Sequence, residues 1–160
     1  MIGATISSVQ ATPAEAITTL IYTYAERIDA GDFDGVAEIF AHATLTFEGL
    51  GEAVEGRDAI AALYARTTRR YEDGTPRTKH VMTNVMVDVD DEGDGGSASS
   101  RSYFTVFQAV PGELALQPVI AGRYRHGYES VDGHWRVTSM HIMIDLMGDL
   151  GHHMLFDLAP

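Results

Sequence analysis

Apolar residues in the first part of the chain recur with the spacing of a helix. Thr12, Pro13 and Glu15 carry the signals of a helix start: a capping hydroxyl, a proline suited to the first turn, and a carboxylate three residues after the cap. Gly31 is a natural helix stop. Between these signals, one apolar face is formed by Ile17, Leu20, Ile21, Tyr24, Ala25 and Ile28.

Shorter helices and then strands are predicted downstream. We expect helices over residues 34–41 and from about 58 to 71, with a short strand over 44–48 between them. The hydrophobic period then changes to two, and four strand-like runs follow that are rich in β-branched and aromatic residues. They cover residues 77–89, 101–110, 119–131 and 134–145. This order predicts an α+β fold in which the helices gather on one face of a curved antiparallel sheet.

Both faces of the predicted sheet are apolar. In the first long run, His80, Met82, Asn84 and Met86 alternate on one face, and valines and a threonine occupy the other. One face must meet the helices, and the other is most simply covered by another subunit. We therefore expect a homo-oligomer, a dimer or trimer, that associates through the outer face of the sheet.

Composition narrows the class of protein. The 160 residues are 45% hydrophobic, which suits one domain with one core, and their formal net charge is −12. This acidity disfavours nucleic-acid and membrane partners, and the absence of cysteine excludes disulfides and thiolate metal sites. No apolar run reaches the roughly 18 residues of a membrane span, and the N-terminus lacks the positive charge of a secretory signal. We expect a cytoplasmic protein.

Several familiar catalytic motifs are missing from the sequence. The seven histidines include no His-x-x-x-His or His-Glu-x-x-His spacing, and the adjacent His152 and His153 would point apart in any regular element. A Gly-rich phosphate loop between strand and helix and a Gly-x-Ser-x-Gly serine motif are also absent. The prediction is therefore a site without metal or cofactor.

His80 and Asp29 are the leading candidates for chemistry. His80 lies near the start of the first long strand, and Asp29 lies in the last turn of the first helix. A pocket histidine can transfer protons near neutral pH if a carboxylate fixes its tautomer, and a carboxylate at a helix C-terminus needs a compensating cation. From position alone, a core histidine and a solvated loop carboxylate are the favoured alternatives.

Other polar and apolar side chains could line the same pocket. Tyr24 lies at the centre of the buried helix face, and a buried tyrosine needs a partner for its hydroxyl or offers it to a ligand. An arginine facing inward would need an anion or a paired carboxylate. The predicted substrate-binding residues are Tyr64, Met82, Tyr103, Arg123 and His141, with Tyr124 as a further tyrosine and Met86, Phe104 and Leu63 as apolar walls.

Short motifs along the chain carry a resemblance to a known family. They are Tyr24-x-x-x-x-Asp29-x-x-Asp32-Phe33, Gly56-Arg57-Asp58-Ala59-Ile60, Thr78-Lys79-His80-Val81-x-x-Asn84, Gly122-Arg123-Tyr124 and Asp132-Gly133-His134-Trp135-Arg136-Val137. Together they resemble the SnoaL-like branch of the nuclear-transport-factor-like superfamily. The resemblance implies a cone, a strongly bent sheet around helices with an apolar pocket inside, as a single domain over residues 1–160 with a core at about 12–145 and a tail at 146–160.

Within that superfamily the chain is similar to scytalone dehydratase and the bile-acid dehydratases. The resemblance implies that Asp29 orients His80 as the acid–base group and that Tyr24 polarises a substrate carbonyl. The implied activity is that of a cofactor-free lyase or isomerase on a hydrophobic small molecule. The alternative is a non-catalytic binding or assembly module like the small subunits of ring-hydroxylating dioxygenases, with a filled interior and a solvated Asp29. The tail could close the pocket mouth or pack on a partner subunit.

Overall fold

The computed structural model describes residues 11–49, 51–90 and 94–156. The expectation of no secretory signal concerns the first ten residues, which lie outside this description. The last four residues of the tail lie outside it as well. The helices are α1 (Pro13–Asp29), α2 (Phe33–Ile39) and α3 (Arg57–Thr67). The strands are β1 (Thr44–Phe47), β2 (Val54–Glu55), β3 (Thr78–Val89), β4 (Ser97–Val110), β5 (Leu114–Val131) and β6 (His134–Met147).

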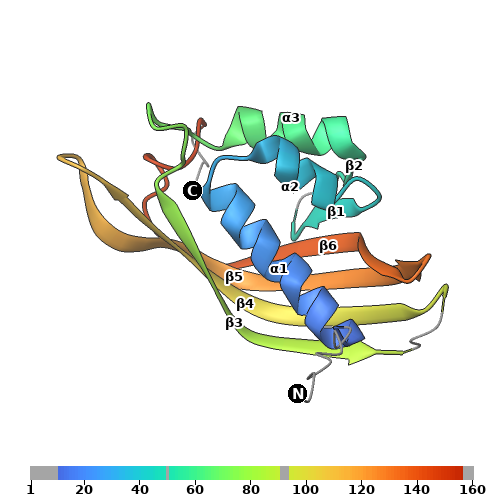
Figure 1. Ribbon diagram of the computed structural model, residues 1–160. Helices are drawn as coiled ribbons and strands as arrows, with labels where there is room; N and C mark the ends of the chain where they lie inside the picture. Colours follow the sequence, from blue (N-terminus) through green and yellow to red (C-terminus); the bar gives the residue numbers. More distant parts are fainter. Residues whose placement is uncertain (1–10, 50, 91–93, 157–160) are drawn as a thin grey trace, which may run out of the picture.

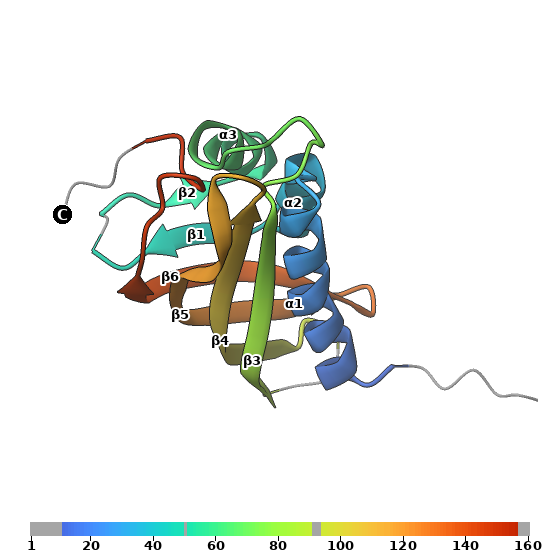
Figure 2. The same ribbon diagram turned by 90° about the vertical axis from the view of Figure 1, so that its left-hand side faces the viewer.

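The strands form one six-stranded sheet in the order β2-β1-β6-β5-β4-β3. Neighbours are antiparallel except β1 and β6, which run parallel. The long strands bend strongly, and all three helices lie on the inner side of the bend (Figures 1 and 2). This is the predicted α+β cone, with the four long strands consecutive in the chain. The two-residue strand β2 was not among the predicted elements.

Helix α1 begins and ends as its sequence signals predict. Thr12 accepts a hydrogen bond from the backbone N–H of Glu15, and the Glu15 carboxylate accepts one from the backbone N–H of Thr12. This reciprocal cap satisfies two donors that a helix start leaves free. The apolar face of α1 then packs into the core, where Ile17, Ile21 and Ile28 are buried.

The third helix is shorter than predicted. It ends at Thr67, because Thr68 adopts extended backbone and forms an isolated antiparallel bridge with Met154 of the tail. Its first turn begins after Gly56, which supplies no side-chain cap, so Asp58 lies within the first turn rather than at the cap position. The segment after the helix is therefore tied to the C-terminal tail, a long-range contact that local periodicity does not encode.

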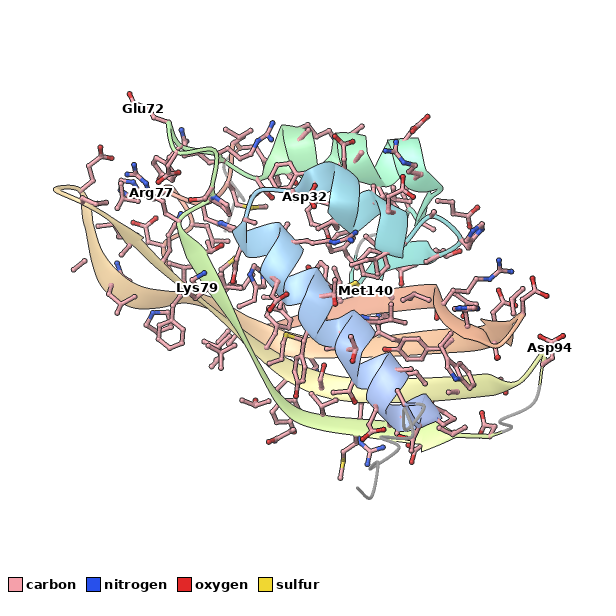
Figure 3. The ribbon with its side chains drawn as sticks, viewed as in Figure 1. Asp32, Glu72, Arg77, Lys79, Asp94 and Met140 are labelled. Carbon is pink, nitrogen blue, oxygen red and sulfur yellow. The ribbon has the colours of Figure 1, made fainter. Side chains whose placement is uncertain are left out.

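The core lies between the helices and the concave face of the sheet. Phe40, Leu45, Ile60 and Met140 are among its most completely buried side chains. Figure 3 shows Met140 between the ribbons of the sheet and the helices. No helix in the described part of the chain is both long and apolar enough to cross a membrane.

Strand β3 changes its inward face halfway along. Between the pairs Thr83 with Tyr103 and Met86 with Arg101, β3 has one residue more than β4, and Asn84 adopts a positive φ of 51° at this bulge. An extra residue in a strand exchanges its two faces from that point on. Met86 is therefore 52% exposed on the outer face, and the expectation that it forms a pocket wall is wrong.

The outer face of the sheet exposes several large apolar side chains. Val81, Met86 and Tyr103 are exposed there, and Leu116, Leu146 and Met147 are exposed towards the ends of β5 and β6. The ion pairs Arg101–Asp88 and Arg123–Asp145 lie on this face as well, so the outer surface is apolar only in part.

Candidate active site

Asp29 and His80 meet where α1 ends and β3 begins. The His80 Nδ1 lies 2.6 Å from Asp29 Oδ1, and both side chains are only 7% exposed. The backbone N–H of His80 also donates to Asp29 Oδ2 at 2.9 Å. Figure 3 labels the preceding residue, Lys79, on β3 beside the C-terminal part of α1. A single carboxylate therefore binds both the ring and the main chain of the histidine.

The Asp29 carboxylate is held in its charged form. Burial alone would raise its pKa, but hydrogen bonds from His80 and Thr78, together with the charge that the imidazole can carry, lower it from its usual value. The Thr78 hydroxyl donates to Oδ1 at 2.8 Å. These donors and the neighbouring imidazole offset the unfavourable position of a carboxylate at a helix C-terminus.

The carboxylate determines which nitrogen of His80 carries the proton. An ionised carboxylate only accepts hydrogen bonds, so Nδ1 of His80 is the donor in the 2.6 Å contact. In the neutral ring, Nε2 then holds a lone pair and no proton. His80 is thereby prepared to accept a proton at Nε2, and the resulting imidazolium would lie against a negative charge.

His80 lines a cavity of about 220 Å³ inside the cone. Its walls come from α1, α3, β1, the long strands and the tail, and they are mainly aromatic and aliphatic. The polar side chains among them are few: Tyr24, Tyr64, Thr67, Thr68, His80, Tyr124 and His153. A small apolar chamber with a few polar groups is typical of a small-molecule site.

Three tyrosines line this cavity together with His80. The hydroxyls of Tyr24 and Tyr64 are 3.4 Å apart, and the Tyr24 ring lies edge-on to the rings of both Tyr124 and His80, at 6.0 and 6.1 Å. Burial raises the pKa of all three tyrosines well above the usual value of 10. The hydroxyls therefore stay protonated and can donate hydrogen bonds to an oxygen in the cavity.

The other predicted site residues lie elsewhere. Tyr103 is 52% exposed on the outer face of β4. Arg123, on the outer face of β5, pairs with Asp145 through two contacts of 2.8 and 2.7 Å. These two predicted substrate-binding residues do not line the cavity, because their neighbours Phe104 and Tyr124 face inward and successive strand residues point to opposite faces.

Met82 and His141 also lie outside the cavity lining. Met82 is half-buried and packs against the core, and His141 Nδ1 is 2.8 Å from the Thr46 hydroxyl on the neighbouring strand β1. The prediction that they contact substrate has no support from their positions. Of the expected apolar walls, Leu63 and Phe104 do line the cavity.

The C-terminal tail supplies lining residues that are not among the predicted site residues. His153, Met154 and Phe156 all contribute to the cavity wall. Of the two expectations for the tail, the described part therefore matches closure of the pocket. The sequence signal for these lining residues is a pair of adjacent histidines, His152 and His153, within an apolar segment. Among the residues that the structure describes, no group of three or more His, Asp or Glu side chains is arranged to hold a metal ion.

Comparison with known proteins shows the family to which the chain belongs. The chain belongs to the SnoaL-like domain family, whose match covers residues 10–141. Epoxide hydrolase LasB of Streptomyces lasalocidi is 36% identical over 80 residues, which make up 47% of this chain and 28% of that enzyme. The match thus spans less than a third of the length of the curated relative.

Solved structures show the same fold at low sequence identity. An NTF2-like protein with a cystatin-like fold from Novosphingobium aromaticivorans has a TM-score of 0.63 and 23% identity, covering 81% of this chain and 80% of that one. A protein of the same organism, provisionally identified as a scytalone dehydratase, has a TM-score of 0.63 and 18% identity, with coverages of 85% and 91%. These similarities establish the fold.

Proposed function

We propose that this member of the SnoaL-like family is a cofactor-free acid–base enzyme, a lyase or isomerase of the dehydratase type. The observation that carries the proposal is the buried hydrogen bond of 2.6 Å between Asp29 and His80 at the wall of an apolar cavity. Such a pair can remove a proton next to a carbonyl group and return it to another atom of the same substrate.

His80 is the proton-transfer group in this mechanism. Its Nε2 takes the proton from the carbon next to the carbonyl, and the negative charge of Asp29 stabilises the imidazolium that forms. The electron pair of the broken C–H bond moves onto the carbonyl oxygen. In an elimination, the imidazolium then protonates the leaving hydroxyl, whereas in an isomerisation it returns the proton to another carbon.

Tyr24 and Tyr64 are the donors proposed to hold the oxygen on which this charge develops. Their hydroxyls lie 3.4 Å from each other, and the Tyr24 ring lies 6.1 Å from the His80 ring. Each is kept protonated by burial, which raises its pKa. Preformed donors in a site without bulk water stabilise an enolate more than they stabilise the neutral ketone.

The cavity points to a hydrophobic carbonyl compound of modest size. A volume of about 220 Å³ is below the roughly 300–1,000 Å³ of drug-sized ligand pockets, so the expected substrate is smaller than a steroid. The mainly apolar walls favour an aromatic or alicyclic body. Family membership and the similarity to a proposed scytalone dehydratase support elimination of water as the leading reaction.

Two other functions are less well supported. A non-catalytic assembly module predicts a filled interior and a solvated Asp29, but this interior is hollow and Asp29 is buried. The similarity to an epoxide hydrolase suggests ring opening by water. That reaction would need two pocket carboxylates beside an arginine, and the sequence offers only Asp145 and Arg123. Those two residues lie outside the cavity.

Association of copies through the outer face of the sheet stays a proposal that is compatible with either activity.

Proton abstraction can be tested with a simple ketone. Benzylacetone carries an aromatic body and exchangeable protons next to its carbonyl, and their replacement by deuterium is followed by proton nuclear magnetic resonance in deuterium oxide. We expect the protein to accelerate exchange and His80→Ala to reduce that rate about a thousandfold. The matched control is His42→Ala, because His42 is an exposed histidine outside the cavity. Circular dichroism would check that both variants are folded.

Two results would count against the proposal. One is a wild-type protein that exchanges benzylacetone and similar aromatic or alicyclic ketones no faster than buffer does. The other is exchange that survives His80→Ala in a folded protein.

A further inference from the structure

His153 lies in a part of the tail that is firmly attached to the rest of the domain. Its backbone carbonyl accepts a hydrogen bond of 2.8 Å from Arg69, and its backbone N–H donates to Leu150. The next two residues also bond to the segment after α3, through the Thr68–Met154 bridge and a 2.9 Å hydrogen bond from Leu155 to Thr67. The position of His153 at the cavity is thus determined by main-chain contacts.

The carbonyl of His152 strengthens this attachment. It accepts hydrogen bonds from the Gln108 side chain at 2.9 Å and from the Tyr71 hydroxyl at 2.7 Å. Both donors come from segments far away in the sequence. The imidazole of His153 makes none of these contacts, so its chemistry is not needed to hold the tail.

The His153 ring itself has no polar partner in the described part of the protein. The residue is 9% exposed and lines the same cavity as His80. Nδ1 is shielded from solvent, and no described residue accepts from it or donates to it. A buried imidazole nitrogen without a partner is costly and calls for an explanation, and at a cavity wall a ligand or a catalytic role can supply one.

The surroundings keep this ring neutral. The pKa of His153 is lowered from 6.5 to about 4, mainly by burial and additionally by the charge of His80, while the charge of Asp29 acts in the opposite direction. At neutral pH the ring has one N–H group and one lone pair. A neutral imidazole of lowered pKa is a suitable hydrogen-bond donor to a polarised substrate oxygen.

We propose that His153 is a second catalytic residue, a neutral hydrogen-bond donor to the oxygen that leaves as water from a β-hydroxy carbonyl substrate. The inference rests on the proposed acid–base function and names its substrate class: an apolar body that carries a carbonyl group and, two carbons away, a hydroxyl group. The tyrosines receive the first oxygen and His153 receives the second.

The elimination balances with the groups present. His80 Nε2 takes the proton from the carbon between the two oxygen-bearing carbons, and the electron pair forms an enolate held by Tyr24 and Tyr64. The enolate then reforms the carbonyl, the new C=C bond forms, and the C–O bond breaks. The leaving oxygen takes the proton back from His80 and departs as water, while the N–H of His153 stabilises the negative charge on that oxygen as the bond breaks. Both histidines end as they began.

Two probes separate this role from that of His80. The aldol adduct of benzaldehyde and acetone has the β-hydroxy ketone pattern, and its dehydration to benzylideneacetone is followed by near-ultraviolet absorbance. Benzylacetone has the same skeleton without the leaving oxygen and reports only proton abstraction. We would measure kcat/KM of both reactions for the wild type, His153→Leu and His153→Gln, with calorimetry to check folding. Gln is the conservative variant because its amide keeps an N–H donor.

We expect His153→Leu to slow elimination about a hundredfold more than it slows exchange, which is the typical effect of removing one donor to a developing oxyanion. His153→Gln should recover most of the elimination rate. Equal losses in both reactions, no loss in either, or no recovery with Gln would overturn the proposal. A wild type that exchanges benzylacetone but eliminates no water refutes the role of His153 alone, and one that performs neither reaction refutes the proposed acid–base function as well.

Discussion

His126 makes the stability of the protein depend on pH in a way that can be calculated. The residue lies on β5 and is 6% exposed, and its ring stacks on Phe40 with 6.5 Å between centroids. Its Nδ1 has no hydrogen-bond partner among the described residues. Burial lowers the pKa of His126 from 6.5 to about 4. The folded state therefore disfavours the charged ring, and the unfolded state does not.

The sign of the effect follows from the lowered pKa. Above about pH 7 the ring is neutral in both states, so His126 carries no electrostatic penalty. As the pH falls through 6.5, His126 becomes protonated in the unfolded chain, whereas in the folded protein it stays neutral until about pH 4. The free energy of unfolding falls across this window by about 1.4 kcal/mol per pH unit, which amounts to about 2 kcal/mol by pH 5 and about 3 kcal/mol at the limit.

His126→Leu should remove this pH dependence while keeping the packing. We expect urea unfolding to show a difference in free energy between pH 8 and pH 5 that is about 2 kcal/mol smaller in the variant than in the wild type. The exposed His42→Leu serves as the control and should leave the difference unchanged. If His126→Leu loses as much stability as the wild type over this range, the ring is not held neutral by burial and the reasoning is wrong.

Three further predictions concern the site and its support. Asp29→Asn should slow benzylacetone exchange by about 10³–10⁴-fold, because the new amide can donate to Nδ1 of His80 and so move the ring proton onto Nε2. A loss below tenfold would contradict the assigned tautomer. Gly122→Ala should lower the free energy of unfolding in urea by about 3 kcal/mol, because the new Cβ would lie 2.0 Å from a backbone carbonyl oxygen of β6. The control is Gly148→Ala, whose Cβ would lie 3.4 Å from its nearest neighbour and should change the stability little. Tyr103→Ser should leave exchange within about twofold of the wild type, and a tenfold loss would contradict the placement of Tyr103 on the outer face.

The elements that the sequence predicts well are those encoded by neighbouring residues. The start of α1 and its buried face follow from a capping motif and a repeated apolar spacing. Asp29 and His80 could be paired in advance because each lies at the end of a well-marked element. The pairing itself, however, depended on a family resemblance, since position alone favoured a core histidine and a solvated carboxylate.

The face of each strand residue was harder to predict. Tyr103 and Phe104 are adjacent on one strand, as are Arg123 and Tyr124 on the next, so only one member of each pair can face the cavity. The alternation alone does not determine which member of each pair faces the cavity. In the structure, Phe104 and Tyr124 face inward. The bulge at Asn84 adds a second uncertainty, because one extra residue exchanges the faces of everything beyond it.

The tail was the least predictable part of the site. Its described residues form no helix and only an isolated bridge, so no hydrophobic period marks which side chains turn inward. The orientation of His153 depends on hydrogen bonds to residues such as Arg69, about 80 positions away in the chain. Such contacts become visible only once the fold has brought the segments together.

The bonds that form the Asp29–His80 pair also join two elements of the fold. One carboxylate accepts from the His80 backbone, the His80 ring and the Thr78 hydroxyl, so it connects the end of α1 to the first residues of β3. The His80 ring cannot rotate away without breaking its hydrogen bond to the Asp29 carboxylate, and this carboxylate is also held by the backbone N–H of His80. The cost of burying a charge at a helix C-terminus is thereby offset by contacts that hold the base in one orientation. A site of this kind keeps its geometry for as long as the domain is folded, and substrates that differ in their apolar body can be accommodated by changing the cavity walls without moving the pair.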